Sequence, residues 1–378
     1  MNPAPLSASK RNWGIQALRG VAATMVLAHH AMEESLAIPS FAGAPDWAVR
    51  WGAAGVDVFF VISGLVVFLA AFESGAGRER GRTPSAFMRD RIQRIYPLYW
   101  ACLALVLALW ASGLGFSSLT VDPGKLLAAV FLLPHHEQVV GVAWTLVYEM
   151  YFYVLIAFAL CFRLNREQTA LFTAGMILAN WGAARLAGGH GAVASFLGDP
   201  IVFEFCYGIG LACLVGRDAI RVRRPVTLAA VGGVLLLLAS AFAPSETTAG
   251  LAPSARFAAW GIPAVLVVVG FSQMAIRPVG WIRGLVFLGA ASYALYLTHG
   301  FVMISYARLI KHGHMPLGGV AGVVLACLAA FALASLAHIF VETPLSRLVK
   351  GALRRPKPMA AGARDQLAPE PSAPLQTL

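Results

Sequence analysis

The stretch that decides the fold is IQALRGVAATMVLAHH, residues 15–30, an apolar run that carries Arg19 and the pair His29-His30. A charged side chain in a membrane helix is costly unless it is paired or faces a wet cavity, so it marks a candidate functional site. Arg19 and His30 are eleven residues apart, which places them on one helix face about 16 Å apart along the axis. His29 points off that face. We therefore expect a polar ligand to run along this helix.

The composition predicts an integral membrane protein. The chain has 378 residues, of which 58% are hydrophobic and 12% are charged, whereas a soluble domain carries about 25% charged residues. The formal net charge of +11 could indicate nucleic-acid binding. However, the basic residues lie in short connections between apolar runs, and no module of aromatic and basic residues is visible. We expect no nucleic-acid partner.

The apolar runs predict an all-α integral membrane protein of about ten transmembrane helices. A further run, 125–134, is too short to span a bilayer and ends at Pro134, so we expect a re-entrant or interfacial segment. The first run is interpreted as a retained helix and not a cleaved signal peptide. The ten expected helices are 13–32, 52–72, 95–114, 142–162, 169–187, 200–216, 226–243, 255–275, 285–309 and 317–341.

The distribution of Lys and Arg predicts the orientation. These residues gather before the first helix, in every second connection and in the C-terminal tail. By the positive-inside rule both termini are then cytoplasmic, in agreement with an even number of helices. We expect a cytoplasmic N-terminal segment (1–12), a membrane domain (13–350) and a cytoplasmic tail (351–378). The tail is rich in Pro, Ala and Gln, and is predicted to be disordered.

Four ionisable residues are expected in the half of the membrane away from the cytoplasm. The predicted topology places His30, Asp57 and Glu149 at similar depth and His299 near mid-depth. An imidazole beside a carboxylate commonly acts as the general base that takes a proton from a hydroxyl. Each residue could instead belong to a structural ion pair, and for Asp57 that alternative is the stronger one.

A second cluster lies where helix 95–114 enters the membrane from the cytoplasmic side. Arg91 and Arg94 are three residues apart and share a face. Guanidinium groups bind phosphates in a bidentate manner, although arginines at this position are also ordinary membrane anchors. A ligand with phosphates on the cytoplasmic side and a reactive tip near mid-membrane would join this cluster to Arg19 and His30. Acyl-coenzyme A has that shape.

The cysteines and the remaining histidines give no metal signature. Cys102, Cys161, Cys206, Cys213 and Cys327 stand singly in apolar runs without metal-binding spacing, as buried small hydrophobic residues do. The pair His135-His136 lies in a loop with too few further ligands for a metal ion, and contact with a glycan substrate is an alternative for it. We expect no metal.

Six short motifs in order give the chain a recognisable resemblance. Arg19 and His30 form an R-x10-H pattern, and the other motifs are spread over the predicted membrane domain. Together they resemble the membrane acyltransferase-3 family, which O-acylates cell-surface glycans, and 15–20 and 141–153 are most similar to the branch that acetylates bacterial exopolysaccharides. The motifs are 18–30, GVDVFFVISG (55–64), RIQRIYPLY (91–99), WTLVYE (144–149), SYALYLTH (292–299) and VETP (341–344).

The resemblance implies an acyltransferase in the inner membrane of a bacterium, with cytoplasmic acetyl-coenzyme A as donor and no metal. The acceptor would be a sugar hydroxyl of an exopolysaccharide, of another surface glycan or of a lipid-linked oligosaccharide precursor. Membrane lipids and polysaccharide-assembly proteins are the other expected partners. Acetyl is preferred over succinyl on the resemblance alone.

The resemblance also suggests roles for individual residues. His30 would be the catalytic base or a transient acyl carrier, and Glu149 would orient His30 or the acceptor. Asp57 is a further catalytic candidate. The expected donor-binding residues are Arg19, Arg91 and Arg94, and the expected substrate-binding residues are His299, Tyr293 and Trp144.

A transporter or flippase for a polar glycan or lipid remains the alternative, because such a protein uses buried charges as a pathway. The absence of a visible internal repeat weighs weakly against it.

Overall fold

The computed structural model describes residues 12–36, 45–72, 81–114, 116, 118–216, 221–246, 250–312 and 319–352. Within these ranges every regular element is a helix, and a single isolated bridge joins Ser245 and Leu251. The prediction of an all-α protein is confirmed. Most of the expected cytoplasmic N-terminal segment and of the expected disordered tail lies outside the described residues.

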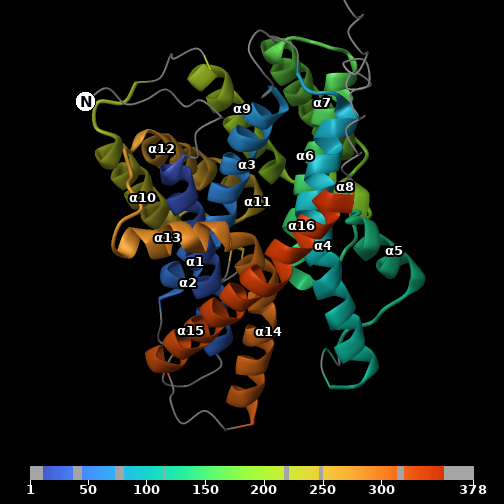
Figure 1. Ribbon diagram of the computed structural model, residues 1–378, viewed down its shortest axis with the longest axis vertical. Coiled ribbons are helices and arrows are strands. Elements are labelled where there is room, and N and C mark those ends of the chain that lie inside the picture. Colours follow the sequence, from blue (N-terminus) through green and yellow to red (C-terminus); the bar gives the residue numbers. More distant parts are fainter. Residues whose placement is uncertain are drawn as a thin grey trace, which may run out of the picture.

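Figure 1 shows the helices in the order in which they follow one another along the chain. In chain order they are α1 (Trp13–Ser35), α2 (Asp46–Ala53), α3 (Gly55–Phe72), α4 (Pro84–Ala111), α5 (Pro123–Phe131), η1 (Gly141–Ala143), α6 (Trp144–Cys161), α7 (Arg166–Leu186), α8 (Ala192–Leu197), η2 (Pro200–Val202), α9 (Phe203–Gly216), α10 (Pro225–Phe242), α11 (Pro253–Ala259), α12 (Gly261–Gln273), α13 (Trp281–Ala290), α14 (Ser292–Lys311), α15 (Val320–Ala337), η3 (His338–Glu342) and α16 (Thr343–Ala352).

Six segments of the described chain are long and apolar enough to cross a membrane, and the bent pair α13–α14 makes a seventh if it counts as one span. The expected count of ten is not confirmed. Helices α1 and α7 are 23 and 21 residues long, yet they are too polar to be among the six. The six segments are Asp46–Phe72, Pro84–Ala111, Gly141–Cys161, Pro225–Phe242, Pro253–Gln273 and Val320–Val349.

Two boundaries differ from the sequence prediction for physical reasons. Helix α4 begins at Pro84 and not at residue 95, because Pro84 suits a first helical turn and the Met, Arg and Gln residues that follow are good helix formers, although Arg and Gln are polar. The expected helix 285–309 is two helices, α13 and α14, which meet at Ala291 with a bend of 81°. Hydropathy shows one apolar run there because it carries no information on axis direction.

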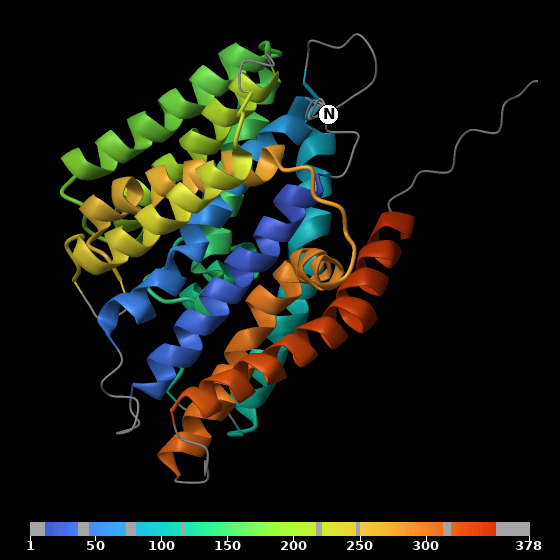
Figure 2. The same ribbon diagram turned by 90° about the vertical axis from the view of Figure 1, so that its left-hand side faces the viewer.

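Helix α1 occupies the centre of the bundle. It packs against α2, α3, α13 and α14. Figure 2 shows it (dark blue) between the yellow helices of the 225–273 region and the orange and red helices of the C-terminal region. The residues of α1 therefore contact both halves of the molecule, and its polar side chains meet groups that lie far away in the sequence.

Helices α3 and α9 approach most closely at two glycines. A Cβ atom on Gly208 would lie 2.4 Å from the carbonyl oxygen of Val61 and 2.5 Å from the Cα atom of Gly64. These are backbone atoms, which cannot rotate away as a side chain would. Small residues that let helix backbones approach are typical of interfaces between membrane helices. This contact fixes the position of α3.

We predict that Gly208→Val destabilises the protein by about 1–3 kcal/mol, because the added atoms force α3 and α9 apart. The measurement is the midpoint of thermal unfolding in detergent. Gly210→Val is the matched control on the same helix, since, apart from its chain neighbours and the nearby backbone of α9, no atom of the described chain lies within 4 Å of its Cβ position. Equal midpoints for the two variants would contradict the prediction.

A buried ion pair joins α3 to α11. Arg256 donates through Nε to Asp57 Oδ1 at 3.0 Å and through Nη2 to Oδ2 at 2.9 Å, and Asp57 is 0% exposed. The guanidinium lies 5.2 Å from the ring centre of Trp260 and 5.9 Å from that of Trp144. Glu204 of α9, also fully buried, adds a second carboxylate nearby. Bidentate geometry and flanking aromatic rings are what a desolvated arginine requires.

We predict that Arg256→Gln lowers the stability by about 3–5 kcal/mol, because it leaves a buried carboxylate without its partner. The double variant Arg256→Gln/Asp57→Asn should recover a large part of that loss, since it removes the uncompensated charge. Thermal unfolding followed by tryptophan fluorescence measures both. A double variant that is no more stable than the single one would exclude the pair as the cause.

Candidate functional site

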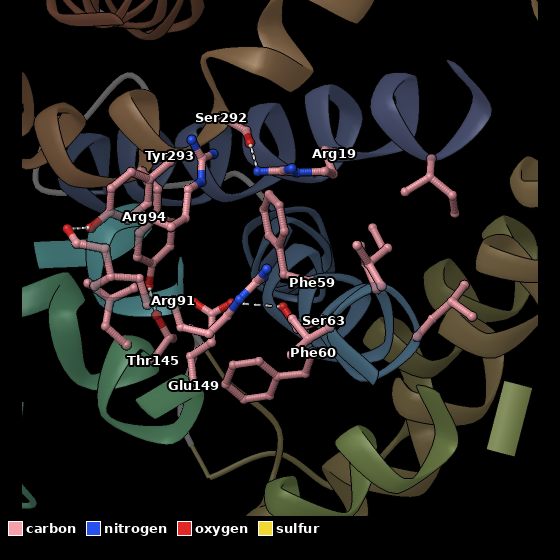
Figure 3. Close-up of a pocket in the computed structure, with 18 of the residues that line it drawn as sticks. Arg19, Phe59, Phe60, Ser63, Arg91, Arg94, Thr145, Glu149, Ser292 and Tyr293 are labelled. Carbon is pink, nitrogen blue, oxygen red and sulfur yellow. Dashed lines mark hydrogen bonds between the residues drawn. The ribbon is translucent and has the colours of Figure 1, made fainter. Parts of the chain in front are cut away.

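A cavity of about 320 Å³ opens between α1, α3, α4, α6 and α14. We call it the arginine cavity, because its charged lining consists of Arg19, Arg91, Arg94 and Glu149. In Figure 3 the three arginines extend toward the same space from α1 and α4. The structure therefore brings together all three residues that the sequence predicts for donor binding. Their actual role in binding stays a prediction.

Arg19 reaches this cavity because of helix periodicity and the bend at Ala291. Asn12, Ile15 and Arg19 recur at helical spacing and line the cavity from α1. The side chain of Asn12 caps α1 by accepting from Ile15 N–H and ties it to α12 by donating to the Ser272 carbonyl at 2.8 Å. Arg19 Nη2 donates to Ser292 Oγ at 3.0 Å. Ser292 is the first residue of α14, so the bend places this hydroxyl.

Arg94 is held by a carboxylate that the sequence analysis did not single out. Its Nη1 donates to Glu342 Oε1 at 2.7 Å, and the other carboxylate oxygen of Glu342 accepts from His338 Nδ1 at 2.7 Å. Glu342 and His338 both lie in the π-helical turn η3. A π-helical turn often occurs at functional sites. The ring of Tyr293 lies 5.4 Å from the guanidinium. Glu342 was visible only as a member of the 341–344 motif.

Arg91 keeps hydrogen-bonding capacity free. Its guanidinium lies 5.7 Å from the ring centre of Phe87 and 5.9 Å from that of Tyr153. Its Nε is buried and has no hydrogen-bond partner among the described residues. A buried guanidinium N–H without a partner is costly. An anionic ligand in the arginine cavity would satisfy it.

Glu149 also lines the arginine cavity, where it accepts hydrogen bonds from Tyr153 Oη at 2.6 Å and from Ser63 Oγ at 3.1 Å. Figure 3 shows Glu149 and Ser63 on the same side of the cavity as Arg91. We expected Glu149 to orient His30 or the acceptor. The structure instead gives His30 a different carboxylate partner, Glu33. A catalytic role for Glu149 stays a prediction.

A second cavity, of about 160 Å³, contains the two histidines, and we call it the histidine cavity. The rings of His30 and His299 are stacked with their centres 5.2 Å apart. His30 Nδ1 lies 3.3 Å from Glu33 Oε2, one helical turn along α1. With Nδ1 facing the carboxylate, Nε2 is the nitrogen left to meet a ligand. This is the geometry of an imidazole oriented by an acid.

His299 has a defined tautomer because its partner can only accept. Its Nδ1 donates to the carbonyl oxygen of Leu295 at 3.0 Å, so Nδ1 carries the proton and Nε2 carries a lone pair. Nε2 is buried and has no hydrogen-bond partner among the described residues. A polar group that enters the histidine cavity would find an acceptor there. The predicted substrate-binding role of His299 is compatible with this position but is not tested by it.

His29 has a structural environment. Its Nδ1 donates to the carbonyl oxygen of Val49 at 2.8 Å, which turns the ring toward α2 as the helix periodicity predicts. His29, His30 and Glu33 together form a group whose potential metal-ligand atoms lie within 4.8 Å of one another. The hydrogen bond between His30 and Glu33 accounts for much of that proximity. The expectation of no metal stays a prediction.

The other predicted residues are separated by the fold. Tyr293 lies in the arginine cavity with the donor-binding candidates, and its hydroxyl donates to the Ile95 carbonyl at 2.6 Å. Asp57 and Trp144 line neither cavity. Asp57 is bound by Arg256, and Trp144 packs against Phe60 with ring centres 6.5 Å apart. Their roles in catalysis and substrate binding stay predictions, and the observed contacts are structural.

The loop with His135 and His136 lines neither cavity. The ammonium group of Lys125 contacts Glu137 Oε2 at 2.9 Å and lowers the pKa of that carboxyl group. His135 Nδ1 lies 2.9 Å from the Glu137 carbonyl oxygen. These contacts shape the loop, and they bring no further metal ligand to it within the described chain.

Comparison with known proteins gives the family. The family model described as an acyltransferase domain matches residues 12–339. The chain is 31% identical over 317 residues to the exopolysaccharide production protein ExoZ of Rhizobium meliloti (strain 1021), and the match covers 80% of this chain and 92% of that protein. A comparison with solved structures found no match. Both cavities lie within the matched residues, and the chain belongs to the acyltransferase-3 family.

Proposed function

We propose that the protein is a membrane O-acyltransferase that moves an acetyl group from acetyl-coenzyme A to a sugar hydroxyl of an exopolysaccharide or of its lipid-linked precursor. One observation carries the proposal: the single helix α1 supplies Arg19 to the arginine cavity and His30 to the histidine cavity. Along α1 the two residues are about 16 Å apart, and the pantetheine arm of a coenzyme A thioester is long enough for that separation.

The charged side chains of the arginine cavity suit a phosphate group of coenzyme A. Three guanidiniums and one carboxylate, Glu149, line the cavity, and Glu342 pairs with Arg94 from outside the lining, so the cavity has an excess of positive charge. The N–H group of Arg91 Nε has no hydrogen-bond partner among the described residues, and a bound anion would accept from it. Arginine binds phosphate through paired N–H groups, which gives geometry as well as attraction. We therefore place the phosphates of the donor at Arg19, Arg91 and Arg94, with the thioester toward His30.

In the proposed reaction His30 acts as the general base. Its Nε2 takes the proton of the acceptor hydroxyl while the hydroxyl oxygen bonds to the acyl carbon. The carbon–sulfur bond breaks, the sulfur leaves with the electron pair, and it takes up a proton from solvent. Glu33 fixes the His30 ring through Nδ1 and stabilises the charge that the ring gains. The partly exposed position of His30 gives the acceptor access.

The two cavities also define the proposed orientation. We place the arginine cavity toward the cytoplasm, where the donor is made, and the histidine cavity toward the opposite face. Both termini are then cytoplasmic, in agreement with the distribution of basic residues. The membrane would be the inner membrane of a bacterium. The name of the Rhizobium relative supports an exopolysaccharide acceptor, and polysaccharide-assembly proteins and membrane lipids would be the partners.

We predict that His30→Ala lowers acetyl transfer by about 10²–10⁴-fold, the usual effect of losing a general base. Membranes that contain the protein are incubated with acetyl-coenzyme A labelled in the acetyl group, and label in polysaccharide or in released acetate is counted. Glu33→Gln should lower transfer less, because it removes only the orientation of the ring.

The control for these variants is His190→Ala, at an exposed histidine in the loop after α7. It should retain wild-type transfer. If His30→Ala retains wild-type activity while His29→Ala abolishes it, the assignment of the base is wrong. If the wild-type protein turns over no acetyl-coenzyme A, the result would favour the alternative of a transporter or flippase.

We predict that Arg91→Ala and Arg94→Ala each weaken coenzyme A binding about 10- to 100-fold, because each removes charge-assisted hydrogen bonds of about 1.5–3 kcal/mol. Calorimetric titration of the purified protein with coenzyme A measures the affinity. Arg89→Ala is the matched control, since Arg89 is on the same helix but exposed and outside the cavity. Unchanged affinity in folded Arg91 and Arg94 variants would remove both residues from the donor site.

A further inference from the structure

One face of α14 lines the two cavities in succession. Ser292 and Tyr296 line the arginine cavity, and His299 and Met303 line the histidine cavity. These residues recur at intervals of four and three, so they form one stripe along the helix. Helix α1 does the same with Arg19 and His30. The two cavities are therefore consecutive along the same pair of helices, and Tyr296 is the last residue of α14 before the histidine cavity.

The hydroxyl group of Tyr296 is held by α6 and by the turn before it. Thr145 Oγ1 donates to Tyr296 Oη at 2.7 Å, and Tyr296 Oη donates to the carbonyl oxygen of Val142 at 2.8 Å. Thr145 lines the arginine cavity, whereas Val142 lines the histidine cavity. This chain of hydrogen bonds crosses the boundary between them. The Tyr296 ring centre is 6.0 Å from that of His299, which is stacked on His30.

We propose that Tyr296 and Thr145 form a boundary between the two cavities that must open for the acyl end of the donor to reach His30. The inference rests on the proposed function, because only then does a ligand bound by arginines have to reach the histidines. The boundary adds two properties to that function. It keeps water in the histidine cavity away from the thioester until an acceptor is present, and it limits the length of acyl chain that passes.

The contacts of Tyr296 suit a boundary that opens. Among the described residues, two neutral hydrogen bonds hold the hydroxyl, and each makes a modest net contribution. The Val142 acceptor belongs to the 3₁₀ turn η1, a conformation with poorer hydrogen-bond geometry than an α-helix. Tyr296 is partly exposed to the cavity, unlike the fully buried Leu295 and Leu297 beside it. Its side chain borders the arginine cavity, which is the space that the ring would enter if the boundary opened.

The test uses the purified full-length protein with three donors and no acceptor. Acetyl-, butyryl- and hexanoyl-coenzyme A are supplied, and the released thiol is measured; hydrolysis converts each thioester and one water into a carboxylic acid and coenzyme A thiol. Tyr296→Ala should raise acetyl-coenzyme A hydrolysis about five- to thirtyfold, the ratio that corresponds to one or two lost hydrogen bonds. It should also turn over hexanoyl-coenzyme A faster than the wild type does.

Two milder variants guard against misfolding of Tyr296→Ala. Tyr296→Phe and Thr145→Val keep the side-chain shape and remove the hydrogen bonds, so their hydrolysis should lie between wild type and Tyr296→Ala. The matched controls are Tyr306→Phe and Thr298→Val, both on α14 like Tyr296. Tyr306→Phe removes a buried hydroxyl that contacts Ser35 Oγ of α1 at 2.9 Å, and Thr298→Val removes a hydroxyl that donates to the carbonyl oxygen of Ala294. Neither control residue lines the arginine cavity or the histidine cavity, and both variants should behave as wild type.

The outcomes separate this proposal from the function on which it rests. If the wild type neither hydrolyses nor transfers from acetyl-coenzyme A, the proposed function fails. If the wild type transfers label but the Tyr296 and Thr145 variants match it in hydrolysis and in chain-length preference, the boundary is overturned. A fall of hydrolysis and transfer together in Tyr296→Phe would assign the hydroxyl to the chemistry and would also overturn the boundary.

Discussion

The need to satisfy charge inside apolar helices governs this structure. Arg256 has a bidentate carboxylate and two indole rings as partners. Arg94 is satisfied in part by Glu342. Arg19 has one hydroxyl partner, and Arg91 has a buried Nε with no hydrogen-bond partner among the described residues. An unpaired guanidinium inside a membrane protein is unfavourable unless water or a ligand completes its hydrogen bonds. The partners of each guanidinium therefore separate Arg256, which has a structural role, from the three arginines that face the arginine cavity.

Three irregularities in the helices each supply one polar contact near the two cavities. The bend between α13 and α14 places the Ser292 hydroxyl against Arg19. The π-helical turn η3 places Glu342 against Arg94. The 3₁₀ turn η1 leaves the Val142 carbonyl for Tyr296. Non-helical backbone at membrane depth is tolerated where it is buried in protein or lines a cavity. Ser292 and Val142 line the cavities and Glu342 is buried, so all three breaks meet that condition.

Helical periodicity made part of the site predictable. The shared face of Arg19 and His30, the proximity of Arg91 to Arg94 and the different direction of His29 all follow from a local repeat of 3.6 residues. The partners of these residues do not. Glu342 is 248 positions away from Arg94, and only the packing of the bundle brings them together. Glu33 lies three residues after His30 and was readable locally, but the depth argument favoured Glu149, because hydropathy gives depth and not lateral position. The bend at Ala291 was missed for the same reason.

The histidine pair adds a constraint on the proposed chemistry. Two imidazolium rings stacked 5.2 Å apart would repel each other in an environment of low dielectric constant, which disfavours a positive charge on both rings at once. His299 has already committed Nδ1–H to a backbone carbonyl and is satisfied as a neutral ring on that side. In the proposed reaction, the positive charge that His30 would gain lies beside the Glu33 carboxylate, whose side chain is 44% exposed. That exposure would give the proton a route to solvent at the end of the molecule where we propose that the acceptor enters, while the arginine cavity would keep the charge proposed to bind the donor.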